Sequence, residues 1–250
     1  MKLFGKKIPL VFSLVAWFAV WELIGRAGLS SIVPPFSSVV AAAIVIAPSD
    51  KFTAAALISL RSFAMGMALA VVVGIPLGIV MARTRALGRI LGMWVNIFVS
   101  APISALVPLL MALVGIGETT VVVTVFLFAV FIIVLDTQVG MTQADHSLVE
   151  MARSFGARRS QLYSKVLILS ALPEILAGLR LGAIRGVKGV VIGQLLVSII
   201  GVGELFELYS NHFLMEEFWA LVLMVFLFAF AVSESIALLE RRVEYYASSR

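Results

Sequence analysis

The sequence has no cysteine among its 250 residues and only two histidines, His146 and His212, which lie far apart. Disulfides, thiolate nucleophiles and cysteine-ligated metals are therefore excluded, and the histidines lack metal-ligand spacing. No Gly-x-x-x-x-Gly-Lys-Ser/Thr loop occurs, so the sequence predicts no site for nucleotide phosphates. Histidines and carboxylates form no cluster in the sequence either. We therefore predict no catalytic residue, no metal and no cofactor bound by the chain itself.

Charged residues are scarce and apolar residues abundant. Asp, Glu, Lys and Arg make up 13% of the chain and apolar residues 62%, against about a quarter and about a half in soluble domains. This excess predicts a surface that faces lipid. A helix of about 20 mostly apolar residues crosses a bilayer, and the candidate stretches are 8–27, 58–82, 90–114, 119–141, 175–200 and 218–239. We expect an all-α polytopic membrane protein with about six transmembrane helices, forming one domain over residues 1–250.

Glycines and prolines mark special positions in these stretches. The sequence from Gly115 to Glu118 predicts a tight hairpin between the third and fourth helices. Pro76, Pro102 and Pro108 are expected to kink or unwind the spans that contain them. A strip of small residues on the second helix predicts close packing against a neighbouring helix; it consists of Gly66, Gly74 and Gly78.

The N-terminus resembles a signal peptide at first sight, because three lysines precede an apolar run. That run, residues 8–24, is longer than a usual signal core, and no convincing small-residue cleavage site follows it. We therefore expect it to be retained as the first helix.

The basic residues are distributed unevenly along the chain. The net charge is +5, with 19 Lys and Arg against 14 Asp and Glu. Basic residues concentrate in the cytoplasmic loops of membrane proteins. If the N-terminus is cytoplasmic, all basic residues except Arg26, Lys51 and Arg61 fall at or near that face, whereas 201–217 carries four glutamates. This predicts that both termini are cytoplasmic and that the positive charge faces anionic lipid, with no nucleic acid as partner.

The longest polar stretch, about 143–173, lies on the predicted cytoplasmic side. Leu148, Met151 and Phe155 recur at helical spacing, and the opposite face is charged. Gly156 interrupts the pattern, although glycine in a helix costs about 1 kcal/mol relative to alanine. The residues alone leave two interpretations open: a helix lying on the inner leaflet, or a docking element for a cytoplasmic partner.

Two further residues of this stretch have local predictions. Glu150 is a candidate contact to such a partner and also has the spacing to close a capping box that begins at Ser147, and the two roles are compatible. Pro173 is expected to break the chain before the fifth span.

The motifs of this stretch resemble those of a known family. Glu150-Met151-Ala152, followed by Gly156 and by Ala171-Leu172-Pro173, is similar to the signature loop of the permeases of binding-protein-dependent ABC importers. Further motifs follow in the order of that family and look most like its nitrate, sulfonate and taurine branch; they are Val33-Pro34-Pro35, Gly74-Ile75-Pro76-Leu77-Gly78, Pro102 to Pro108, Gly115-Ile116-Gly117-Glu118 and 175–180. The resemblance covers about residues 10–242.

The sequence departs from the family pattern at three places. Met151 replaces an alanine of the signature, and Leu169-Ser170 stand where many relatives have a first proline. Gln194 stands where many relatives of this branch carry an acid. The third departure concerns the expected pathway and weakens any transfer of a substrate from relatives.

The resemblance implies the type I ABC importer permease fold and a bacterial cytoplasmic (inner) membrane location. It implies that about 143–173 is a coupling segment seated in a groove of a separate ATP-binding subunit, which holds ATP and Mg²⁺. The implied importer also contains a second permease copy, which forms a homodimer with the first. Two ATP-binding subunits and an extracytoplasmic solute-binding protein complete it. It would move a small polar or anionic solute, such as nitrate, a sulfonate, taurine or a vitamin precursor, by alternating access. The residues implied in coupling are Glu150, Met151, Ala152, Arg153, Phe155, Gly156, Ala157 and Arg158.

Uncharged polar residues within the expected spans are candidates for lining the pathway, with helix-to-helix hydrogen bonds as the alternative. They are Asn96, Ser100, Ser104, Gln194 and Ser198. A self-contained secondary transporter or channel is the alternative function. It predicts coupling carboxylates at mid-membrane and often an inverted repeat, and neither is evident in the sequence.

Overall fold

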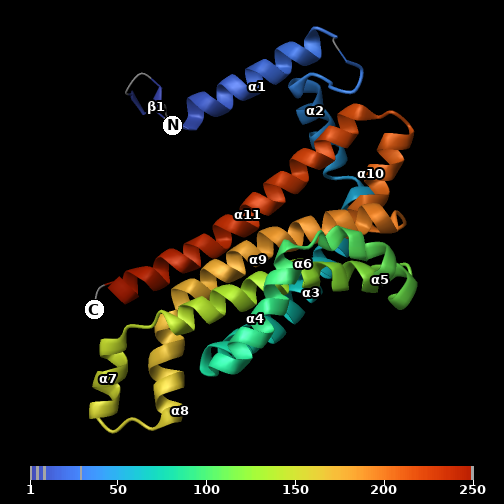
Figure 1. Ribbon diagram of the computed structural model, residues 1–250. Helices are drawn as coiled ribbons and strands as arrows, with labels where there is room; N and C mark the ends of the chain where they lie inside the picture. The colour runs from blue at the N-terminus through green and yellow to red at the C-terminus, as the bar shows by residue number, and fades with distance from the viewer. Residues whose placement is uncertain (1, 4–5, 8–9, 29, 249–250) are drawn as a thin grey trace.

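The computed structural model describes residues 2–3, 6–7, 10–28 and 30–248. Within these ranges the chain is helical apart from a short antiparallel strand pair at the N-terminus (Figure 1). The elements are β1 (Lys2–Leu3), β2 (Lys6–Lys7), α1 (Leu10–Arg26), α2 (Phe36–Ile46), α3 (Asp50–Arg83), α4 (Arg85–Ser100), the 3-10 helix η1 (Ile103–Leu106), α5 (Val107–Val114), α6 (Glu118–Thr142), α7 (His146–Ser154), α8 (Arg159–Leu162), the π-helix η2 (Tyr163–Leu167), α9 (Ile168–Val197), α10 (Gly201–Asn211) and α11 (Met215–Ser248).

Four helical stretches are long and apolar enough to cross a membrane: α3, α6, α9 together with the preceding η2 and α8, and α11 up to Arg242. A fifth span exists if α4, η1 and α5 are taken together, although the chain bends there by 90°. The helical membrane fold is thus confirmed. The expected count of six is reduced to four or five in the described part of the chain.

The first expected span is the one that falls short. Helix α1 has 17 residues, which corresponds to about 25 Å of helix against about 30 Å of hydrocarbon. Residues 8 and 9, where we expected it to begin, lie outside the described residues. In Figure 1 α1 projects from the body of the molecule and meets it at α2.

Helix α6 occupies the centre of the bundle, between α3 and α9 (Figure 1). Its buried residues are spread around the whole circumference of the helix, as expected of a helix without a solvent face. The predicted glycine strip is confirmed as its contact with α3: a Cβ on Gly66 would lie 2.5 Å from Val125 Cβ, and one on Gly78 would lie 2.6 Å from Thr137 Cβ. Glycines of α9, including Gly178 and Gly182, contact α6 from the other side in the same way.

The prolines differ in their effects, and the expected kink or unwinding is confirmed at Pro102, where the chain bends by 90°. Pro102 separates α4 from η1, and Pro108 stands in the first turn of α5, where a missing N–H costs nothing. Pro76 lies within the continuous helix α3. The expected break at Pro173 is wrong, because α9 begins at Ile168 and runs through the proline.

The reason for the continuous helix at Pro173 is packing on both sides of the proline. Ala171 and Ile175 are buried against Met141 of α6, and this contact fixes α9 on the bundle despite one lost backbone hydrogen bond. The fifth span therefore begins well before residue 175.

Candidate functional site

The loop between α6 and α9 is a helical hairpin that extends beyond one end of the bundle (Figure 1). We call residues 146–162, which comprise α7, the turn and α8, the α7–α8 hairpin. All eight residues that the sequence implied in coupling lie in it, on α7 and in the turn. The structure thus brings these residues together at one end of the molecule.

The turn of the hairpin depends on Gly156. The N–H of Gly156 donates to the Arg153 carbonyl at 2.9 Å, and the N–H of Ala157 donates to the Ala152 carbonyl at 3.0 Å. This pair of bonds, with a left-handed residue at φ +76°, is the Schellman arrangement that ends many helices. A glycine adopts such a φ without strain. The glycine that interrupts the helical pattern therefore marks the end of α7 and the reversal of the chain.

The predicted capping box at Ser147 does not form. Helix α7 begins at His146 with Asp145 as its N-cap, and the Asp145 carboxylate accepts a hydrogen bond from the Ser147 N–H at 2.9 Å. Glu150 therefore lies two residues beyond the third helical position that a capping box requires. The next helix has a comparable bond, in which the Arg158 N–H donates to Gln161 Oε1 at 2.9 Å.

The hairpin presents apolar side chains to its surroundings. Leu148 is 39% exposed, Met151 53% and Phe155 85%. Phe155 lies in the turn, next to Gly156, and a Cβ on Gly156 would meet no atom within 4 Å. Exposed apolar residues that stand singly need no explanation, but two on one face of a short helix and a third in the turn directly after it form a surface that a partner could cover.

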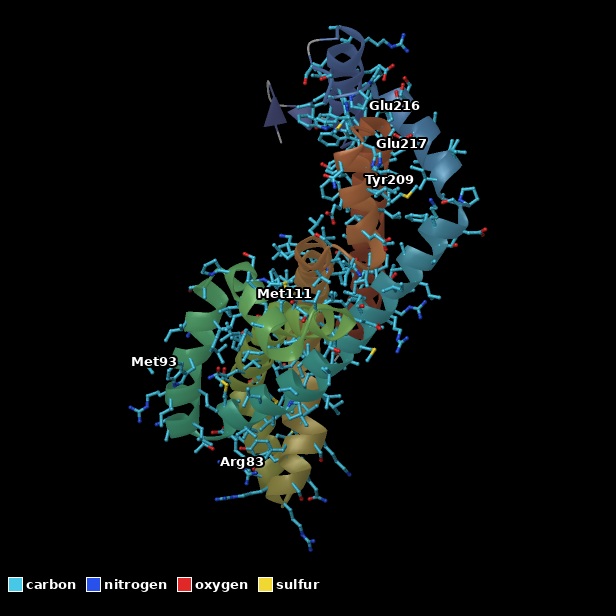
Figure 2. All side chains as sticks on the ribbon, turned by 90° about the vertical axis from the view of Figure 1, so that its right-hand side faces the viewer. Arg83, Met93, Met111, Tyr209, Glu216 and Glu217 are labelled. Atoms are coloured by element: carbon cyan, nitrogen blue, oxygen red, sulfur yellow. The ribbon has the colours of Figure 1, made fainter. Side chains whose placement is uncertain are left out.

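The base of the hairpin is attached to three spans. Its second helix continues through η2 into α9, and its first follows α6 after a short connection. Tyr163 and Ala82 of α3 pack against the same buried cluster, and the Arg83 guanidinium lies over the Tyr163 ring, 5.6 Å from its centroid. Figure 2 shows Arg83 at this end of the molecule. A displacement of the hairpin would therefore act on α3, α6 and α9 together.

The opposite end of the bundle is acidic. Tyr209, Glu216 and Glu217 lie there in Figure 2. Burial raises the pKa of the Tyr209 hydroxyl above its ordinary value, and the negative charge of Glu217 raises it further. Basic Arg83 and the hairpin arginines thus lie at one end and carboxylates at the other.

The five candidate pathway residues do not form one site within a single chain. Asn96 and Ser100 are exposed on α4, and Ser104 is half-buried in η1. Ser198 ends α9 in a left-handed conformation. Gln194 is fully buried.

Gln194 lies where α3, α9 and α10 meet. Ser59 Oγ lies 2.8 Å from Gln194 Oε1 and also accepts a hydrogen bond from the Val202 N–H at 3.0 Å. A Cβ on Gly203 would lie 2.4 Å from the Gln194 carbonyl oxygen, so only a glycine allows α10 to approach this closely. Among the described residues, Gln194 Nε2 has no hydrogen-bond partner.

Sequence reasoning missed two residues of these arrangements. Ser59 lies 135 residues from Gln194, and nothing in its neighbourhood indicates a long-range partner. Tyr163 was part of the polar stretch, but its contact with Arg83 depends on the π-helix η2. Such wide turns are rare and have no simple sequence signature.

A family described as "Binding-protein-dependent transport system inner membrane component" matches residues 74–245, more than half of the chain. The chain belongs to this family. The match includes α4 to α10 and the whole α7–α8 hairpin, and it confirms the resemblance to importer permeases and the multi-pass membrane character.

Individual relatives match shorter segments. The taurine transport system permease protein of Escherichia coli (strain K12) is 27% identical over 136 residues, 54% of this chain and 50% of that protein. The riboflavin transport system permease protein of Chloroflexus aurantiacus is 31% identical over 106 residues, 42% of this chain and 40% of that protein. The chain thus spans half or less of the length of these curated relatives.

Solved structures share the fold over a larger part. An inward-facing structure of the MetNI methionine ABC transporter has a TM-score of 0.65 at 21% identity and covers 75% of this chain and 93% of its own. A structure of an amino acid ABC transporter with histidines has a TM-score of 0.64 at 15% identity and covers 76% and 93%. At these identities the likeness concerns the fold, and it confirms the expected type I importer permease fold.

Proposed function

We propose that the chain is the membrane-spanning permease subunit of an ATP-driven importer, and that its α7–α8 hairpin docks on a separate ATP-binding subunit. The exposed apolar face of the hairpin carries this proposal. Helix α7 extends about 13 Å at 1.5 Å per residue, and Figure 1 shows the turn after it at the far end of the hairpin. Phe155 follows the last residue of α7 and therefore lies in this turn. An apolar side chain held there in water is stabilised when a protein partner covers it.

The charges of the hairpin support a protein partner. Glu150 and Arg153 are exposed on the side of α7 opposite the apolar residues, and Arg158 is exposed in the turn, so a groove that encloses the hairpin would contact both kinds of side chain. Gly156 lets the partner's backbone approach closely, because no side chain stands there. Met151, Ala152 and Ala157 complete the docking surface.

The partner would supply the energy. Two ATP-binding subunits, each holding ATP and Mg²⁺, would move the hairpins of two permease copies, which form a homodimer in the membrane. The hairpin's attachment to α3, α6 and α9 would convert this movement into alternating access.

An extracytoplasmic solute-binding protein would deliver the solute at the acidic end, and both termini and the hairpin would be cytoplasmic. The whole chain, residues 1–250, would act as one permease domain, surrounded by lipid and without a nucleic acid partner.

The pathway would lie between the two copies. Asn96 and Ser100 are exposed on α4, beside apolar side chains such as Trp94 and Ile97. Polar groups are costly in lipid, so they would face the pathway together with Ser104 and Ser198. Gln194 would shape the wall from within. We propose a small polar or anionic solute, in keeping with the taurine and riboflavin permeases among the relatives.

Substitutions at two matched glycines test the docking. Gly156→Arg places a large side chain on the docking face, and Gly28→Arg provides the control. Both glycines have positive φ, +76° and +63°, and open space at Cβ, so the backbone strain is comparable. We expect Gly156→Arg to abolish co-purification of the ATP-binding subunit and Gly28→Arg to retain it. Normal co-purification with Gly156→Arg would show that the hairpin is not the docking element.

A further inference from the structure

A cavity of about 200 Å³ lies between α3, α9, α10 and α11. We call it the α3–α11 groove. Most of its lining is apolar, with Leu60, Phe206 and Phe228 among the larger side chains. Its polar side chains, Ser59 and Gln194, contact each other at 2.8 Å. The surface that the groove offers to an occupant is therefore mostly hydrocarbon.

The groove opens towards the outside of the bundle. Leu60 and Phe228 line it and are nevertheless 49% and 36% exposed. The neighbouring Leu57 and Leu227 are 67% and 59% exposed. These residues belong to the two long apolar helices α3 and α11, whose exposed side chains face lipid in a membrane. The medium at the mouth of the groove is therefore lipid rather than water.

The groove lies in the half of the bundle next to α10. Its lining on α3 comes from residues 52–60, near the start of that helix, and on α11 from residues 221–228, in its first half. On α9 it comes from residues 187–194, near the end. All three segments lie away from the α7–α8 hairpin (Figure 1). A lipid at the mouth thus belongs to the leaflet nearest α10.

Neither water nor empty space suits such a groove. An apolar cavity of about 150 Å³ stays dry and takes up a hydrocarbon ligand when one is available. The atoms that line an unfilled void lack dispersion contacts on that side. In a membrane, van der Waals packing is the main source of affinity between apolar surfaces. We infer that the α3–α11 groove binds one acyl chain of a membrane phospholipid from the leaflet nearest α10.

Photo-crosslinking tests this inference. The full-length chain is placed in lipid nanodiscs that contain a phosphatidylcholine with a diazirine on one acyl chain, and the adducts are located by mass spectrometry after irradiation. We expect adducts on residues 52–60 and 221–228 above the level on Leu238 and Leu239, which are exposed apolar residues at the other end of α11.

Variants that fill the groove separate specific from general lipid contact. Ala56→Leu fills it from α3, and Val225→Leu fills it from α11 should the first variant not fold, since both residues line the groove. Ala54→Leu, an exposed position on α3 outside the lining, is the matched control. We expect the excess adducts to be lost in the filled variants and kept in the control.

Two results would overturn the inference. The first is an adduct pattern on the groove residues that the filling variants leave unchanged, or that never exceeds the level on Leu238 and Leu239. The second is a crosslink to a second copy of the chain from a photoreactive amino acid placed at Leu60 in the lining, which would make the groove a protein interface.

Discussion

Ser59 is the residue on which the contact between α3, α9 and α10 depends. Its hydroxyl oxygen lies near two acceptors, Gln194 Oε1 at 2.8 Å and the Ala55 carbonyl at 3.0 Å, and it accepts from the Val202 N–H. That N–H belongs to the first turn of α10, where backbone donors have no partner within the helix. A side chain of α3 thus accepts a hydrogen bond from a backbone N–H at the start of α10 that has no partner within that helix.

Two substitutions at this contact should differ in their effect on stability. Ser59→Ala leaves the Val202 N–H and Gln194 Oε1 without partners, and we expect a loss of about 1–3 kcal/mol. Gln194→Met should remain within about 1 kcal/mol of the parent, because Ser59 can donate to Ala55 and the unpartnered Nε2 disappears. Thermal unfolding of the purified proteins in one detergent measures both. Equal losses would contradict this, because they would show that the amide contributes as much to the contact as the hydroxyl.

Tyr163 connects the hairpin to α3 through its ring beneath Arg83. A cation over an aromatic face contributes about 0.5–1 kcal/mol at an exposed site. We expect Tyr163→Leu to lower solute uptake about two- to fivefold while ATP hydrolysis by the assembled complex continues, since docking is intact. Tyr163→Phe keeps the ring and should behave as the parent. A loss of uptake with both variants would assign the effect to the hydroxyl instead.

Helix α6 is positioned by glycines on the elements that contact it. On α3, a Cβ at Gly66 would lie 2.5 Å from Val125 Cβ and 2.8 Å from the Val122 carbonyl oxygen. The carbonyl belongs to the backbone of α6 and cannot move without displacing the helix. At Gly92 on α4 the nearest atom is Met81 Cε at 3.8 Å, the end of a flexible side chain.

The same substitution should therefore have opposite effects on the two helices. Gly66→Ala forces α3 and α6 apart, and we expect a loss of about 1–3 kcal/mol through overpacking. Gly92→Ala should stabilise the protein by about 0.5–1 kcal/mol, because alanine favours the helix. Thermal unfolding with matched lipid and detergent compares them. A stable Gly66→Ala protein would mean that the α3–α6 contact is looser than these distances indicate.

At the scale of the whole molecule, Glu216 and Glu217 lie at one end and Arg83 at the other (Figure 2), with the arginines of the α7–α8 hairpin at the end of Arg83. The absence of cysteine makes orientation directly measurable, because a single introduced cysteine is the only thiol. We expect Phe155→Cys to react with a membrane-impermeant maleimide only from the cytoplasmic side, and Gly28→Cys only from the opposite side. Both positions are exposed. Labelling of Phe155→Cys from outside would reverse the topology and remove the basis for an ATP-driven mechanism.

The sequence by itself determined the membrane class, the short turn before Glu118 and the amphipathic segment interrupted at Gly156. Each of these depends on composition or on neighbours within one or two helical turns. The sequence predicted a kink or unwinding at Pro102, but tertiary structure decided its angle of 90°, the continuous helix through Pro173 and the contact of Ser59 with Gln194. A proline can bend, cap or merely weaken a helix, and the packing around it selects the outcome. Contacts 135 residues apart leave no trace in local periodicity.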